Sequence, residues 1–331
     1  MQHANRRGFV ALTLAFGLSA AACGSSSRVS STTPTVSSTP AAGVVKCTAP
    51  AARGTRTLAL TIDGHPRTVI VHEPTTRSSA VVPLIVNLHG SGSDARGQEH
   101  FSGMDATADA HGFVVAYPQA AIRVPGGFDW NVPGVPLRGG ASVPAGAAND
   151  ESFLTQLVPM LQPSDCIDPT RVYVTGMSGG GRMASQLGCD AAPVFAAVAP
   201  VAGLRFPSPC PATGAVPIVA FHGTADAVDP FDGNGQAYWT YSVPTAAQRW
   251  ATHNHCAGPA PTPMRPGVGE TLYGGCRDDA TVVLYAIADE GHEWPGGPTM
   301  PRAITRVLGA QSSAIDANDV MWQFFAAHPR R

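Results

Sequence analysis

From residue 47 to residue 331 the chain alternates short apolar runs with segments that carry apolar side chains at helical spacing. This alternation constrains the fold more than any other feature, because alternating strands and helices build a mostly parallel sheet with helices on both faces. We predict strands over residues 84–88, 113–117, 172–175, 196–200, 218–221 and 281–287. We predict helices over residues 104–110, 151–161, 179–187, 242–253 and 316–327, the last with Val320, Met321, Phe324 and Phe325 facing inward. A segment of this length is enough for one large α/β core.

Two turn-rich stretches interrupt the pattern. Asp63-Gly64 separates apolar runs at residues 58–62 and 68–72, and Asp-Gly between such runs predicts a β-hairpin. Residues 118–149 are rich in Gly and Pro and contain Trp130. Loops of this length are uncommon in a compact domain unless they have a function, so we interpret this one as a lid on the substrate side.

The first 22 residues have the features of an export signal. Arg6 and Arg7 precede an uncharged, mostly apolar run, residues 8–22, that is too short to span a bilayer as a stable helix. The run ends in small residues directly before Cys23, as in a bacterial lipobox, so we expect Cys23 to be the lipidated first residue of the mature protein. Secretion without a lipid is the alternative, and the arginine pair also fits the twin-arginine pattern.

These features divide the chain into a signal peptide at residues 1–22, a stalk at 23–46 and a folded domain at 47–331. The stalk is rich in Ser, Thr, Pro and Ala, a composition that cannot build a core. We expect an exported protein that is either secreted or attached to the outer face of the cell membrane through a lipid anchor alone.

Six cysteines remain once Cys23 is set aside, and an even number in an oxidising compartment indicates disulfides. Spacing alone does not settle the connectivity, and free buried thiols are an alternative. Pairing of sequence neighbours predicts three bridges: Cys189–Cys210, Cys256–Cys276 and, from the remaining two, Cys47–Cys166.

Charge and residue usage exclude several classes of function. The formal net charge is −2, which gives no electrostatic case for a nucleic-acid partner. Lys46 is the one lysine in the chain, so the folded domain has none for a phosphate-binding loop or a Schiff base. The sequence His253-Asn254-His255-Cys256 looks metal-like, but a helix end beside a disulfide explains it better. We expect no metal, no cofactor and no obligate protein partner.

Gly176-Met177-Ser178-Gly179-Gly180 lies between a predicted strand and a predicted helix. A sharp turn here forces the serine into a strained conformation with its hydroxyl exposed at the carboxyl edge of the sheet, and the glycines relieve the crowding. The following helix aims backbone N–H groups at a developing negative charge. We therefore predict that Ser178 is a nucleophile; the alternative is a glycine-rich turn with a bystander serine.

A serine nucleophile needs a base, and the base needs an acid that orients it. After a G-x-S-x-G turn the acid precedes the base in the chain. His292 lies in a Gly/Pro-rich loop after the predicted strand at 281–287, so we predict it to be the base. His222 is the less favoured candidate, and we expect it to brace a loop.

The predicted acid is Asp226, which follows the strand at 218–221 and so lies at its carboxyl end. Asp229, three residues further on, is its rival. Asp289 and Glu290 are too close to the base in sequence to orient it from a separate loop, and we expect both to be solvated.

Attack on a carbonyl also needs donors for the oxyanion. One is the backbone N–H of Gly179, the residue after the nucleophile. For the other we choose Ser91, in the Gly/Ser-rich loop that follows the predicted strand at 84–88. The alternative is an ordinary Gly/Ser loop.

Six segments together resemble the secreted esterase family that includes polyhydroxybutyrate depolymerases, feruloyl esterases and acetylxylan esterases, in particular its actinobacterial esterase lipoproteins. They are residues 88–92 (LHGSG), 108–118 (ADAHGFVVAYP), 176–181 (GMSGGG), 195–203 (FAAVAPVAG), 222–226 (HGTAD) and 291–297 (GHEWPGG). The resemblance covers most of residues 47–331 and implies a disulfide-stapled α/β-hydrolase fold, a mostly parallel central sheet with helices on both faces.

The resemblance also implies that Ser178, Asp226 and His292 form the catalytic triad and that the cysteines pair as expected above. It places Trp294 near the substrate pocket, with packing of the loop as the alternative, and Trp130 is a further pocket candidate. The sequence departs from the family after Asp226, at residues 228–231, and after the strand at 113–117. These positions face the substrate, so family specificity does not carry over.

The leading hypothesis is therefore an exported serine carboxylesterase that works through an acyl-enzyme on a small or polymer-derived ester. One alternative keeps the fold and transfers the acyl group to an envelope hydroxyl instead of water. The other is a lipoprotein that uses an inert hydrolase fold to bind a ligand. The sequence does not name the ester.

Overall fold

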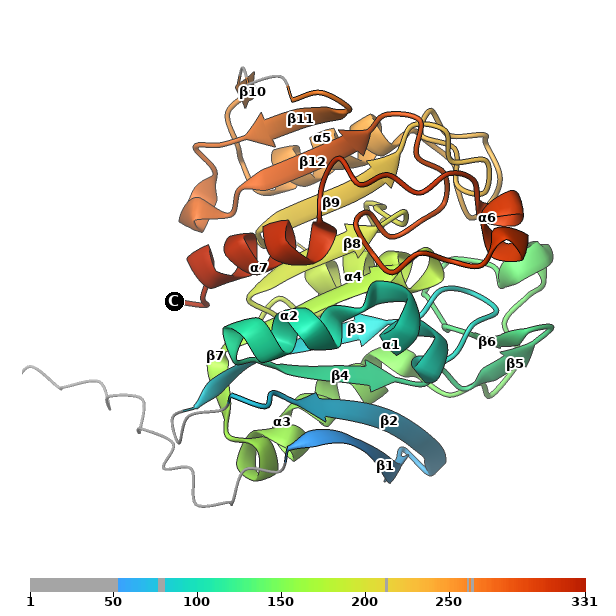
Figure 1. Ribbon diagram of the computed structural model, residues 1–331, viewed down its shortest axis with the longest axis vertical. Coiled ribbons are helices and arrows are strands. Elements are labelled where there is room, and N and C mark those ends of the chain that lie inside the picture. The colour runs from blue at the N-terminus through green and yellow to red at the C-terminus, as the bar shows by residue number, and fades with distance from the viewer. Residues whose placement is uncertain (1–52, 77–80, 212–213, 261, 263–264) are drawn as a thin grey trace, which may run out of the picture. The chain divides into compact units, whose positions relative to one another are not determined.

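A sheet of ten strands forms the centre of the part of the chain that the computed structural model describes, which is residues 53–76, 81–211, 214–260, 262 and 265–331 (Figure 1). These residues belong to one unit, Val44–Arg331. The strands, in spatial order, are β1 (Gly54–Ile62), β2 (His65–Glu73), β4 (Val114–Pro118), β3 (Val82–Leu88), β7 (Ile167–Met177), β8 (Ala197–Val201), β9 (Ile218–Gly223), β12 (Val282–Ile287), β11 (Val268–Tyr273) and β10 (Pro259–Ala260).

The six central strands, from β4 to β12, run parallel to one another, and the outer strands on both sides pair antiparallel. Helices cover both faces, as Figure 1 shows. Strands β3, β4 and β8 are buried along their whole length because both of their faces are covered, which explains their almost entirely apolar sequences. The predicted parallel α/β architecture is confirmed.

One face of the sheet packs against α3 (Asp150–Asp165), α4 (Gly179–Asp190) and α5 (Val243–His253). Their apolar side chains, including Phe153, Leu187 and Trp250, form one continuous core with that face. The opposite face packs against α1 (Ala95–Ser102), α2 (Met104–His111) and α7 (Ala317–Ala327). The carboxyl ends of the parallel strands therefore lie together at one edge, between two helical layers.

Most predicted elements occur within a few residues of the expected bounds, and the Asp63-Gly64 hairpin is present. The third helix extends beyond residue 161 to Asp165, where Cys166 takes a left-handed conformation as its C-cap. Met321 and Phe325 of α7 are buried as predicted. Val320 and Phe324 are only half-buried, because the helix lies at the surface of its layer.

The prediction missed short, polar or half-exposed elements. Helix α1 is largely polar. Helix α6 (Arg302–Leu308) is short and buries none of its side chains, although Ile304, Val307 and Leu308 are apolar. Strands β10 and β11 lie at the exposed edge of the sheet. Within the predicted lid loop, β5 (Ile122–Val124) and β6 (Gly127–Asp129) form a small hairpin.

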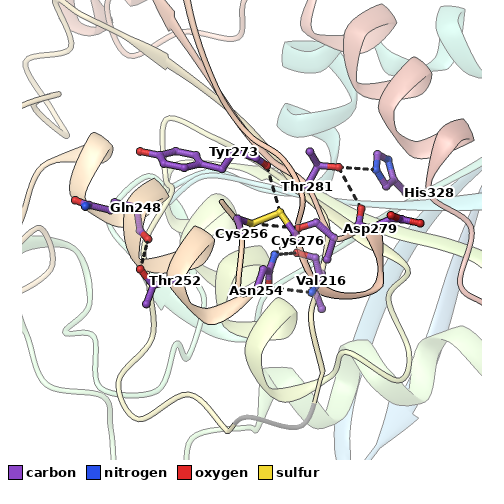
Figure 2. Close-up of a disulfide and its surroundings, with 11 residues drawn as sticks. Val216, Gln248, Thr252, Asn254, Cys256, Tyr273, Cys276, Asp279, Thr281 and His328 are labelled. Carbon is purple, nitrogen blue, oxygen red and sulfur yellow. Dashed lines mark hydrogen bonds between the residues drawn. A yellow bond between two sulfur atoms is a disulfide. The ribbon is translucent and has the colours of Figure 1, made fainter. Parts of the chain in front are cut away.

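Two of the predicted disulfides are confirmed, Cys189–Cys210 and Cys256–Cys276. Figure 2 shows the second, which links the segment after α5 to the segment before β12. Beside it the buried Asn254 amide donates to Val216 O and Ala280 O, both at 2.8 Å. Cys47, the predicted partner of Cys166, lies outside the described residues, as do Cys23, the signal peptide and the stalk. No helix in the described ranges has the length and apolar character needed to cross a bilayer.

The Cys256–Cys276 bridge closes a loop of sequence separation 20, so we predict that Cys256→Ala/Cys276→Ala lowers the free energy of unfolding by about 3 kcal/mol. Cys189→Ala/Cys210→Ala, with a separation of 21, is the matched comparison and is expected to lose a similar amount. Denaturant unfolding under oxidising conditions measures both. An unchanged midpoint in either variant would contradict a stabilising role for that bridge.

Candidate active site

Ser178 occupies the turn between β7 and α4, with φ 54° and ψ −115°, a strained conformation for a non-glycine residue. Three neighbouring glycines make this turn possible. A Cβ on Gly180 would lie 2.3 Å from Leu88 O, one on Gly176 would lie 2.6 Å from the carbonyl carbon of Gly180, and one on Gly203 would lie 2.4 Å from Ser178 O. Backbone therefore packs directly on backbone around the serine.

The same turn fixes the direction of the serine backbone. The Ser178 N–H donates to Val201 O at 2.9 Å, and Ser178 O accepts from the Arg182 N–H at 2.8 Å, in the first turn of α4. Ser178 lies at the carboxyl edge of the sheet and at the N-terminus of a helix, where backbone N–H groups favour negative charge.

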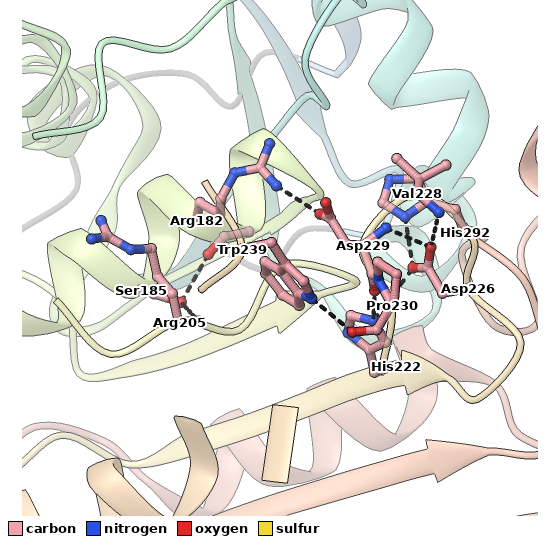
Figure 3. Close-up of polar contacts among 11 residues, drawn as sticks. Arg182, Ser185, Arg205, His222, Asp226, Val228, Asp229, Pro230, Trp239 and His292 are labelled. Carbon is pink, nitrogen blue, oxygen red and sulfur yellow. Dashed lines mark hydrogen bonds and ion pairs between the residues drawn. The ribbon is translucent and has the colours of Figure 1, made fainter. Parts of the chain in front are cut away.

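His292 and Asp226 come from the loops after β12 and β9, which are adjacent parallel strands. Their side chains meet at the edge of the sheet, where His292 Nδ1 donates to Asp226 Oδ2 at 2.7 Å (Figure 3). This bond occupies Nδ1, and none of the described residues forms a hydrogen bond with His292 Nε2. His292 and Ser178 line the same two cavities, so the structure brings the three predicted residues to one place.

Asp226 is held as a carboxylate. Its Oδ1 accepts from the N–H groups of Val228 and Asp229, both at 2.8 Å, and His222 Nε2 lies 3.3 Å from its Oδ2. Burial on its own raises the pKa of Asp226, but hydrogen bonds from His222 and His292 outweigh burial and hold the pKa well below its ordinary value. An ionised acid is what orients a histidine base and stabilises its imidazolium.

The rival acid, Asp229, is engaged elsewhere. Its Oδ2 accepts from Arg182 Nη1 at 2.6 Å in a buried ion pair, which Figure 3 shows pointing away from His292. His222 donates through Nε2 to the backbone oxygen of Asp229 at 2.7 Å and stacks on Trp239. His222 therefore braces the acid loop, as the sequence suggested.

The loop after β3 lies directly against the serine. A Cβ built on Gly179 would lie 3.1 Å from Ser91 N, so the two predicted oxyanion donors are close neighbours. The next two amides of the loop are occupied, because Gly92 N donates to Phe128 O and Ser93 N donates to Gly90 O. Within the described ranges no acceptor is in bonding distance of Ser91 N, which leaves that N–H available to a substrate.

The two tryptophans proposed for the substrate pocket are structural in this arrangement. Trp294 is fully buried and donates through Nε1 to Asn318 Oδ1 at 2.9 Å. Trp130 is 3% exposed, donates to His89 O at 2.7 Å and packs on the His89 ring. Neither lines a cavity at Ser178, so the structure supports the packing alternative for Trp294 and gives Trp130 the role of supporting the loop after β3.

Two cavities meet at Ser178 and His292. The first, of about 280 Å³, is lined mainly by apolar or uncharged groups, among them Phe101, Met177 and Ile304. The second, of about 360 Å³, is lined by residues 136–139 of the predicted lid loop together with Arg182, Asp229 and Tyr238. Helix α6, which the sequence analysis missed, contributes Leu308 to both.

The prediction that Glu290 is solvated was wrong, although its neighbour Asp289 is exposed. Glu290 is 1% exposed, and Glu293 on the other side of His292 is 2% exposed. Burial raises the pKa of Glu290 to about 8 and that of Glu293 to about 7. The chain turns inward at Gly291, whose N–H donates to Ala310 O at 2.8 Å. The spacing of residues in the sequence did not indicate that Glu290 is buried.

The raised pKa of Glu290 predicts a pH-dependent stability. Between its ordinary pKa of 4.5 and about 8, the native state keeps a proton that the unfolded chain loses, so the free energy of unfolding falls as pH rises. Glu290→Gln removes the ionisable group and should be more stable than the wild type at pH 8, by on the order of 2 kcal/mol, with little difference near pH 4.5. Denaturant unfolding across this range measures the effect.

Asp289→Asn is the matched control, since it makes the same chemical change at the exposed neighbouring position. It is expected to retain the wild-type pH dependence. Parallel stability–pH curves for Glu290→Gln and the wild type would show that the burial of Glu290 has no such consequence.

Comparison with known proteins agrees with this geometry. The family described as Esterase PHB depolymerase matches residues 69–244. The chain is 32% identical over 262 residues to the protein named "Putative esterase NocK" of Nocardia uniformis subsp. tsuyamanensis, covering 71% of this chain and 73% of that protein. It is 30% identical over 238 residues to feruloyl esterase B of Piromyces equi, covering 68% of this chain but only 42% of that longer protein.

Among solved structures, the acetyl xylan esterase from Aspergillus awamori superimposes with a TM-score of 0.55 at 15% identity, over 82% of this chain and 99% of that one. The native structure of sOPH superimposes with a TM-score of 0.53 at 18% identity, over 85% and 89%. At these identities the likeness establishes the α/β-hydrolase fold. The sequence matches go further: the chain belongs to the esterase PHB depolymerase family of carboxylic ester hydrolases.

Proposed function

We propose that this protein is an exported serine carboxylesterase in which Ser178 is the nucleophile, His292 the base and Asp226 the orienting acid. The observation that carries the proposal is the 2.7 Å bond from His292 Nδ1 to the buried Asp226 carboxylate, at the wall of cavities that His292 shares with Ser178. A strained serine, a free imidazole nitrogen and an ionised acid are the parts that acyl transfer through serine requires.

In the first half of the reaction, His292 Nε2 takes the proton of Ser178 Oγ as that oxygen attacks the ester carbonyl carbon. The N–H groups of Gly179 and Ser91 stabilise the negative charge on the carbonyl oxygen. The C–O bond to the alcohol then breaks, and the proton passes from His292 to the leaving oxygen. In the second half a water molecule, deprotonated by His292, attacks the acyl-enzyme and releases the acid with Ser178 restored.

The proposed location rests on the cysteines. Two disulfides within the described residues fit an oxidising compartment, which agrees with the export signal expected at residues 1–22. We further propose that Cys23 carries the lipid anchor and that residues 23–46 are a stalk joining it to the catalytic domain at 47–331.

The nucleophile is tested by hydrolysis of p-nitrophenyl acetate, butyrate and octanoate by the full chain with its disulfides intact. We expect turnover by the wild type, and a loss of kcat of about 10⁴-fold or more in Ser178→Ala, because no other group replaces the attacking oxygen. Equal, near-background rates in both proteins would overturn the esterase proposal. That result would favour the two alternatives, an acyltransferase or a ligand-binding protein without catalytic activity.

The identity of the acid is tested by a matched pair of variants. Asp226→Asn removes the charge that faces His292 and favours the wrong ring tautomer, so kcat should fall by about 10³- to 10⁴-fold. Asp229→Asn breaks the ion pair with Arg182 and should act mainly on stability, with kcat reduced less than about tenfold. The reverse order of effects on kcat would assign the acid to Asp229.

A further inference from the structure

The two cavities that meet at Ser178 differ in charge. The walls of the first contain no Arg, Lys, Asp or Glu. The walls of the second contain Arg138, Arg182 and Asp229. Because Arg182 and Asp229 form an ion pair with an Nη1–Oδ2 distance of 2.6 Å, they compensate each other. Arg138 remains as a single uncompensated positive charge beside the nucleophile.

Arg138 is placed by its surroundings. Its backbone N–H donates to the buried Asp129 Oδ2 at 2.7 Å, and the preceding Leu137 is buried and donates through its N–H to Ala141 O at 2.8 Å. The Arg138 guanidinium packs on Gly92, where a Cβ would lie 2.4 Å from Nη1. Gly92 follows Ser91 directly, so the charge lies against the loop that borders the reaction centre.

Among the residues that the structure describes, the Arg138 guanidinium has no partner of opposite charge. Asp129, the nearest carboxylate along this loop, bonds the backbone of Arg138, and within the described ranges no carboxylate is in ion-pair distance of its guanidinium. An exposed, unpaired guanidinium at the wall of a cavity is suited to bind a carboxylate through two parallel hydrogen bonds. One uncompensated positive charge matches a monoanion better than a phosphate ester with two charges.

We infer that the substrate is an ester with one apolar arm and one arm that carries a carboxylate, which Arg138 binds in the second cavity. The inference rests on the proposed esterase function and names its substrate class. The apolar arm occupies the uncharged cavity beside Phe101 and Met177, so the ester carbonyl lies at Ser178 where the two cavities meet. Arg138 is then a specificity-determining residue.

Two pairs of nearly isosteric esters test the inference in the full chain. 4-Methylphenyl acetate and 4-acetoxybenzoate differ by a carboxylate in place of a methyl group on the alcohol arm, and phenyl butyrate and monophenyl succinate differ in the same way on the acyl arm. We expect the wild type to prefer the anionic ester in at least one pair. In Arg138→Gln the anionic-to-neutral ratio of kcat/KM should fall about tenfold or more, mainly through KM, and Arg138→Lys should restore part of it.

Arg123→Gln is the matched control. It removes the same charge from the same loop, where the Arg123 guanidinium lies over the Phe128 ring and does not line the cavity. The ratio should keep its wild-type value in this variant.

Three outcomes would overturn the inference: no preference for the anion in either pair, an equal loss on neutral and anionic esters in Arg138→Gln, or the same change of ratio in Arg123→Gln. The second outcome would assign Arg138 to stabilising the oxyanion. The proposed function is tested separately, by comparing hydrolysis of the neutral esters by the wild type and by Ser178→Ala. If the two rates are equal, the esterase proposal fails and this inference fails with it.

Discussion

The proposed active site depends on the contact of backbone with backbone beneath Ser178. The turn from β7 into α4 places Gly180 against the carbonyl oxygen of Leu88, at the end of the neighbouring strand, with no room for a Cβ. That contact sets the serine at φ 54°, brings the loop with Ser91 beside Gly179, and aligns the start of α4. The strain in one residue is held by a sheet and a helical layer with large buried cores, which over-determine its position.

The second organising element is the buried carboxylate of Asp226. Two backbone N–H groups and two histidines surround it, and each has its own place in the fold: His222 at the end of β9, His292 after β12. Because these strands are parallel neighbours, the distance between Asp226 and His292 is set by the sheet and not by the loops alone. Glu290 and Glu293 flank His292 in the sequence, but both are buried and burial raises their pKa values. The carboxylate that bonds the His292 ring is that of Asp226.

The sequence was most informative where reactive side chains lie beside glycines at the ends of strands. Ser178, Asp226 and His292 lie at strand ends marked by glycine, so the order of strands predicts that they meet. The sequence failed where burial depends on distant segments. Glu290 has an ionisable side chain and follows an exposed residue, yet the chain turns inward at Gly291 against the segment after α6. Trp130 and Trp294 were predicted to line the substrate pocket, but hydrogen bonds to His89 and Asn318 hold them in the interior. Helix α6 is only seven residues long and buries no side chain, and the sequence alone did not show that its apolar residues Ile304, Val307 and Leu308 line the two cavities.

Covalent trapping tests whether His292 activates Ser178. The full chain is treated with a fluorophosphonate at neutral pH and digested, and the modified peptide is identified by mass spectrometry. We expect a single adduct on Ser178. It should form rapidly in the wild type and at least about 10²-fold more slowly in His292→Ala. An adduct on another residue, or an unmodified Ser178 in protein that hydrolyses esters, would contradict it.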